Sequence, residues 1–220
     1  MNVPATFKRN LSPASLVTCW SERPEAMDPR RLEAFSDGVM AVIITIMAFE
    51  LKTPRAPTMH ALVGRLPSLL IYILSFVFVG IYWNNHHHLL RATQRINGAV
   101  MWSNLHLLFW LSLIPFATGW VGVAHQRALP AAVYGAVGLG AGVAYYTLSR
   151  AILRANRDDA AISDAIGRDV KGIASTVVYA AAIALAYVSP YISYACFVAV
   201  ATSWLIPDRR LTRSPVATEQ

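Results

Sequence analysis

Polar and ionisable side chains lie near one end of each of the first three apolar runs of the sequence. Asp37 lies near the start of the first apolar run, and the second run ends in Tyr-Trp-Asn-Asn-His-His-His at residues 82–88. Asn97, Asn104 and His106 lie at the start of the third run. Such side chains can exchange hydrogen bonds and protons, and imidazole nitrogens can also bind a metal ion.

The three adjacent histidines, His86, His87 and His88, are the first candidate for a metal site. Consecutive helix residues point about 100° apart, whereas two helical ligands of one ion stand three or four positions apart. The spacing therefore predicts no metal centre and no cofactor. An ionisable group inside a membrane bundle needs a partner, and a histidine that donates from Nε2 to the Asp37 carboxylate is the simplest one.

The composition is typical of a membrane protein. Of 220 residues, 55% are apolar and only 14% are charged, and the mean hydropathy is +0.43, whereas soluble domains carry roughly 25% charged residues. The two cysteines, Cys19 and Cys196, exclude a disulfide framework. The chain has a net charge of +7, but its basic residues do not alternate with aromatic residues as they would in a nucleic-acid-binding groove. We therefore expect no nucleic-acid partner.

Runs of about 20 apolar residues predict an all-α, polytopic membrane protein with six transmembrane helices. The predicted spans are 32–51, 66–85, 98–120, 130–149, 172–189 and 191–206. Pro190 separates the last two spans, because proline does not continue a helix. Pro115, with Ser112, is expected to kink the third span.

The basic residues predict the orientation. Of 19 lysines and arginines, only Lys52, Arg55, Arg65 and Arg127 fall on one side of the six spans. By the positive-inside rule both termini are cytoplasmic, in a multi-pass protein of the cell (inner) membrane. We expect residues 1–27 to form a flexible polar tail, 28–210 the six-helix domain and 211–220 a C-terminal tail.

Two other segments have structural interpretations. The linker from Arg150 to Lys171 mixes charged and apolar residues and is expected to form an amphipathic helix at the cytoplasmic interface. Small residues four positions apart in the fourth span are expected to pack helices within one subunit. These residues are Ala131, Gly135, Gly138 and Gly142.

The first span carries two distinct faces on a helical projection. An apolar stripe combines Phe35, Val39, Val42, Ile46 and Phe49. A narrow face of small residues beside it, made of Ala41, Thr45 and Ala48, permits close approach of another helix.

Three segments in order resemble one known family. The first reads R-x-x-x-F-S-D-G, with Arg31, Phe35, Ser36, Asp37 and Gly38, and continues V-x-A-V-x-I-T-I-x-x-F-E-L. The others are Trp83-x-Asn85-His86-His87 and the stretch 112–118. Together they resemble the prokaryotic members of the transmembrane protein 175 (lysosomal potassium channel) family.

The resemblance implies a potassium-permeable cation channel, not an enzyme. In that family, four six-helix subunits form a homotetramer, whose central pore is lined by the first helix of each. Carried over by position, the constricting rings would be Val42, Ile46 and Phe49, and Thr45 would lie beside the filter. The signature and its polar network would include Arg31, Phe35, Ser36, Asp37, Gly38, Trp83, His86, His87 and Asn104. For Arg31, anchoring on the basic side and hydrogen bonding in this layer both stay open. The implied partners are potassium ions and the lipid bilayer.

The physics of such a pore follows from its side chains. No T-V-G-Y-G run supplies carbonyl rings, and the stripe carries no acid. Apolar rings gate by dewetting and favour potassium modestly, because it is less strongly hydrated than sodium. A small proton-coupled secondary transporter that uses Asp37 and the histidines is the alternative, although no inverted repeat is visible. A membrane enzyme with a histidine metal centre is disfavoured by the ligand spacing.

Overall fold

The computed structural model describes residues 28–157 and 170–205 of the chain, and its regular elements there are all helices. The helices are α2 (Pro29–Phe49), α3 (Met59–Val63), α4 (Leu66–Arg91), α5 (Gly98–Ser112), α6 (Ile114–Ala124), α7 (Ala128–Ala155), α9 (Val170–Leu185) and α10 (Pro190–Leu205). The predicted all-α class is confirmed.

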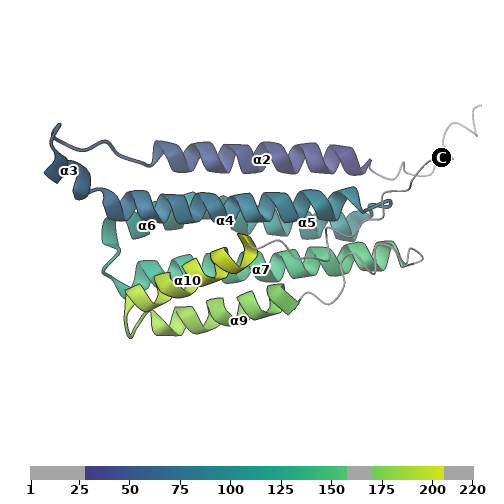
Figure 1. Cartoon of the computed structure of the whole chain (residues 1–220). Coiled ribbons are helices and arrows are strands. Elements are labelled where there is room, and N and C mark those ends of the chain that lie inside the picture. Colours follow the sequence, from purple (N-terminus) through teal and green to yellow (C-terminus); the bar gives the residue numbers. More distant parts are fainter. Residues whose placement is uncertain (1–27, 158–169, 206–220) are drawn as a thin grey trace, which may run out of the picture.

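The long helices lie side by side with α2 at one edge of the bundle (Figure 1). α2 packs against α4, α5 and α6, and α7 packs against α5, α6, α9 and α10. The α9–α10 pair lies on the side of the bundle away from α2 (Figure 1). The other described helices of the chain therefore cover only one side of α2.

Local sequence signals explain where the helices begin. Asp28 caps α2 by accepting a hydrogen bond from the Arg30 backbone N–H at 3.0 Å, and Pro29 occupies the first turn, where no N–H is needed. Asn97 caps α5 in the same way, through the Val100 N–H at 3.0 Å. α6 has no side-chain cap, because it starts directly after the break at Leu113.

The expected breaks are present. α5 ends at Ser112 and α6 starts at Ile114, so Pro115 interrupts the third span as predicted. α10 starts at Pro190 and the break there is present as predicted, but α9 ends at Leu185, before the predicted end at residue 189. α4 continues to Arg91, past the predicted end at residue 85, so all three histidines are helical. The five-residue helix α3 was not predicted.

Among the described residues, four helical segments are long and apolar enough to cross a membrane, with α5 and α6 counted as one segment. α9 and α10 have 16 residues each, which is about 24 Å against a hydrocarbon core of about 30 Å. A polytopic membrane protein is therefore supported, while six crossings and the side of the termini stay predictions. The predicted tails, 1–27 and 211–220, and linker residues 158–169 lie outside the described residues.

Glycines in α7 make room for aromatic side chains of its neighbours. A Cβ added at Gly138 would lie 2.7 Å from the Tyr179 ring on α9, and one added at Gly140 would overlap the Trp110 ring on α5. Gly142 faces Thr176 in the same helix pair, with 3.3 Å from an added Cβ to the Thr176 hydroxyl oxygen. The prediction that Gly138 and Gly142 pack helices within one subunit is confirmed.

Candidate functional site

One face of α2 is buried against its own subunit. Its members recur every three or four residues, as helical geometry requires for a single face. They are Leu32, Ser36, Met40, Ile43 and Met47. This face fixes which side of α2 remains available to other molecules.

The apolar stripe lies on the side of α2 that its own subunit leaves open. The side chains of Val42, Ile46 and Phe49 are 54%, 45% and 88% exposed. They follow Phe35, which is 53% exposed. An open groove of about 830 Å³ runs between this stripe and the residues Ser112, Pro115 and Phe116. Large apolar side chains in such a row indicate a surface that contacts lipid, another subunit or a pore.

Thr45 is also exposed, but it lies beside the stripe. Its hydroxyl donates a hydrogen bond to the Val42 carbonyl oxygen at 2.8 Å, within α2. The hydroxyl oxygen keeps acceptor capacity on the open side of the helix.

A buried hydrogen-bond network ties α2 to α4 and α5. Asn104 Nδ2 donates to Ser36 Oγ at 2.9 Å, and Asn104 Oδ1 lies 2.7 Å from His86 Nε2. Since Asn104 uses its amide nitrogen toward Ser36, its oxygen accepts, and His86 donates from Nε2. Ser36 Oγ donates a hydrogen bond to the Leu32 carbonyl oxygen at 2.8 Å. All three side chains are fully buried.

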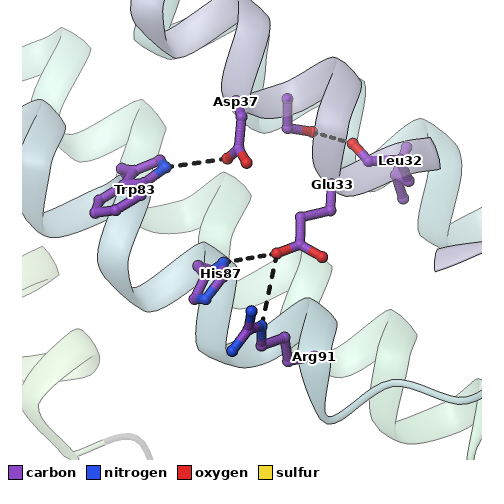
Figure 2. Close-up of polar contacts among 7 residues, drawn as sticks. Leu32, Glu33, Asp37, Trp83, His87 and Arg91 are labelled. Carbon is purple, nitrogen blue, oxygen red and sulfur yellow. Dashed lines mark hydrogen bonds and ion pairs between the residues drawn. The ribbon is translucent and has the colours of Figure 1, made fainter. Parts of the chain in front are cut away.

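A second, more exposed group of contacts joins α2 to α4 (Figure 2). The Trp83 indole Nε1 donates to Asp37 Oδ1 at 3.0 Å, and His87 Nδ1 lies 2.6 Å from Glu33 Oε1. Arg91 Nε lies 4.0 Å from the same Glu33 oxygen. The prediction that a histidine of 86–88 holds Asp37 is wrong, because tryptophan holds Asp37 and histidine pairs with Glu33.

α2 and α4 are antiparallel, which explains why Asp37 pairs with Trp83 and Glu33 pairs with His87. Glu33 and Asp37 are one turn apart on α2, and Trp83 and His87 are one turn apart on α4. In an antiparallel pair the later residue of one helix faces the earlier residue of the other. Asp37 therefore meets Trp83 and Glu33 meets His87.

The predicted signature residues divide between these two surroundings. Ser36, Asp37, Trp83, His86, His87 and Asn104 form the contacts between helices, whereas Phe35 and Gly38 lie on the open side of α2. Arg31 is exposed, and among the described residues no hydrogen bond or ion pair joins its side chain to the network. Sequence reasoning missed Glu33 and Arg91 as members. Glu33 lies one helical turn before Asp37, and Arg91 lies one turn after His87. This spacing was the sequence signal that could have identified both residues.

The histidines do not converge on one point. His86 faces Asn104, and His87 faces Glu33. Within residues 28–157 and 170–205, no group of three His, Cys, Asp or Glu side chains is placed to hold a metal ion. The arrangement ties helices together by hydrogen bonds and leaves an apolar stripe open.

Comparisons with known proteins identify related sequences and one related structure. The sequence model of the family described as "Endosomal/lysosomal potassium channel TMEM175" matches residues 31–115. A protein of Chryseobacterium sp. named as a potassium channel is 46% identical over 188 residues, which cover 86% of this chain and 98% of that protein. A potassium channel of Chamaesiphon minutus is 29% identical over 80% of this chain and 94% of its own length.

A solved structure shares the fold. The crystal structure of a lysosomal potassium-selective channel TMEM175 homolog from Chamaesiphon minutus aligns with a TM-score of 0.72 and 26% identity, over 81% of this chain and 96% of that one. These relatives are named as channels, which are not enzymes, as the sequence led us to expect. The match across nearly the whole length of the Chryseobacterium protein shows that this chain belongs to the TMEM175 family.

Proposed function

We propose that the chain is one subunit of a homotetrameric, potassium-permeable cation channel whose pore is lined by α2. The observation that carries the proposal is the exposed stripe of Val42, Ile46 and Phe49 on a helix whose opposite face is buried. Two relatives that match most of this chain are named potassium channels.

Closure of the pore requires several copies of the chain. One α2 per subunit cannot enclose an aqueous path, so identical helices must surround a common axis in a closed ring. The groove beside the stripe, bordered by Pro115 and Phe116, offers a neighbouring subunit an apolar surface next to α2. Each stripe residue then becomes a ring around the axis.

The rings at Val42, Ile46 and Phe49 act as hydrophobic constrictions. An ion that passes an apolar ring sheds part of its hydration shell, and this costs less for potassium than for sodium. Thr45 adds a hydroxyl oxygen beside the rings. Selectivity in this mechanism is modest, because no carbonyl ring replaces the lost water.

The outer end of α2 attracts cations. The C-terminus of a helix carries partial negative charge, and Glu50, at the C-cap of α2, is exposed and lines the groove. Four such carboxylates around one axis would raise the local cation concentration. Glu50 therefore supplies the charge that the apolar rings lack.

The contacts between α2 and α4 set the rotation of the pore helix. Asp37 and Glu33 bind α4 through Trp83 and His87, on the side of α2 away from the stripe. The proposal also includes six membrane crossings, cytoplasmic termini and the cell (inner) membrane, as the charge distribution predicts.

Single-channel recording of the purified protein in planar bilayers tests the proposal. We expect unitary potassium currents and a cross-linked tetramer in native membranes. Potassium flux without unitary currents would indicate the transporter alternative. A monomer or dimer after cross-linking would overturn the pore assignment, since the rings would not close.

A further inference from the structure

Three buried hydroxyl groups meet in the apolar interior, toward the opposite end of α2 from the network around Asn104. Ser75 Oγ on α4 lies 2.7 Å from Thr118 Oγ1 on α6 and 3.0 Å from the Tyr134 hydroxyl on α7. Thr118 Oγ1 in turn points at the Met47 sulfur of α2, at 4.0 Å. All four side chains are 5% exposed or less. The cluster joins four helices at one point.

The cluster forms a single directed chain of hydrogen bonds. Thr118 donates to Met47, so the hydrogen between Ser75 and Thr118 comes from Ser75, and Tyr134 donates to Ser75. Each hydroxyl donates once, and the chain ends on a thioether, which is a weak acceptor. In an apolar interior, a hydroxyl that loses its acceptor is strongly penalised. The hydroxyls therefore resist separation from one another, and the longer contact with the Met47 sulfur adds a weaker link to α2.

Met47 connects this chain to the pore helix. It lies on the same face of α2 as Ser36, three turns or roughly 16 Å away along the axis. Ser36 is hydrogen-bonded to Asn104. One face of α2 is therefore attached to neighbouring helices at two positions along its axis, at Ser36 and at Met47. Met47 directly precedes Ala48 and Phe49 and follows Ile46, so it sits at the level of the two outer rings.

We infer that Ser75, Thr118 and Tyr134 are positioning residues that fix the outer half of α2 through Met47, and thereby set the width of the rings at Ile46 and Phe49. The functional part of this inference rests on the proposed pore. Among the described residues, the contacts around Met47 contain no carboxylate and no histidine, unlike the contacts around Ser36, which include His86.

The test compares two isosteric variants with a matched control. Thr118→Val and Met47→Leu each remove one end of the contact while keeping the side-chain volume. Thr147→Val makes the same chemical change on α7, where the hydroxyl is exposed and bonds only to the Val143 carbonyl of its own helix. The measurements are the potassium-to-sodium permeability ratio and the amide hydrogen exchange of residues 44–49 in the full-length protein.

We expect Thr118→Val and Met47→Leu each to speed amide exchange at residues 44–49 by roughly fivefold, the effect of losing one modest hydrogen bond. Each should also shift the potassium-to-sodium permeability ratio by about twofold or more. The double variant should differ little from Thr118→Val alone, because Thr118→Val already removes the contact with Met47 and also leaves the Ser75 hydroxyl without its acceptor. Thr147→Val should leave both quantities unchanged.

Unaltered exchange and permeability in both chain variants would overturn the inference. A fall in thermal stability with an unchanged permeability ratio would also overturn it, because a merely structural role predicts that pattern. If the wild-type protein carries no current, the proposed function fails, while the exchange rates still decide whether the chain holds the outer half of α2.

Discussion

The indole of Trp83 on α4 donates a hydrogen bond to the Asp37 carboxylate on α2 over 3.0 Å. Trp83 is 44% exposed, so water can replace part of this contact. The Trp83–Asp37 hydrogen bond therefore joins α4 to α2 at a partly exposed site. The Asp37 carboxylate does not pair with a buried histidine.

Trp83→Phe removes this donor and keeps an aromatic ring. We expect a loss of about 1 kcal/mol in unfolding free energy, below the value for a fully buried charged pair, because solvent screens the contact. Asp37→Ala should cost a similar amount, not the roughly 3 kcal/mol expected for a carboxylate that holds a buried cation. The measurement is thermal or denaturant unfolding in one detergent.

Trp102→Phe is the control for this change. Trp102 is 74% exposed on α5, and the same substitution there should change stability by less than about 0.5 kcal/mol. Equal losses in the two variants would show that the Asp37 contact contributes nothing.

Ile46→Asn should hydrate one of the proposed apolar rings. We expect a higher conductance and a potassium-to-sodium permeability ratio close to one, because discrimination by partial dehydration is lost. The measurement is the reversal potential under bi-ionic conditions, together with the unitary current.

Ile73→Asn is the matched control for the ring variant. Ile73 on α4 is 48% exposed, close to the 45% of Ile46, but it lies outside the proposed pore helix α2. It should leave selectivity unchanged. Ile43 is unsuitable as a control, because it is buried in the subunit core. If Ile73→Asn altered selectivity and Ile46→Asn did not, the assigned pore face would be wrong.

Gly140→Ala should destabilise the subunit. The added methyl group would overlap the Trp110 ring, and overpacking of this kind costs about 1–3 kcal/mol. Gly80→Ala on α4 is the control, because nothing lies within 4 Å of a Cβ at that position. It should stabilise by up to about 1 kcal/mol through helix propensity. Melting temperatures of the two variants should therefore move in opposite directions.

Glu50→Gln should lower the potassium conductance at low salt. Removing one carboxylate per subunit from the proposed outer mouth should reduce the local cation concentration. The expected loss is about twofold in unitary current at 10 mM salt, where the Debye length is about 30 Å. Near 1 M salt the difference should disappear, because screening shortens that length to about 3 Å. A reduction that persists at high salt would indicate a structural effect of the substitution.

Features within one helix were predictable from the sequence. Helical periodicity separated the stripe of Val42, Ile46 and Phe49 from its surroundings, and the structure leaves these side chains exposed. Pro115 and Pro190 marked two helix ends correctly, because proline acts locally. The pore role of the stripe stays a prediction.

Contacts between helices were less predictable, because a sequence gives the angle around one helix but not its offset against another. An offset of one turn exchanges Glu33 for Asp37 as the partner of His87, so the sequence alone does not distinguish the two pairings. The chain of Ser75, Thr118 and Tyr134 was not predicted at all, since its members are far apart in the sequence.

The separation of the two faces of α2 has a genetic consequence. Residues that hold α2 in its own subunit, such as Ser36 and Met47, are distinct from those on the open side, such as Ile46. A subunit altered only at Ile46 should therefore fold and join wild-type partners. In the proposed tetramer, equal co-expression leaves only about one-sixteenth of the channels free of altered subunits. Substitutions on the open face should be dominant, whereas disruptive substitutions on the buried face, those that prevent a subunit from folding, should be recessive.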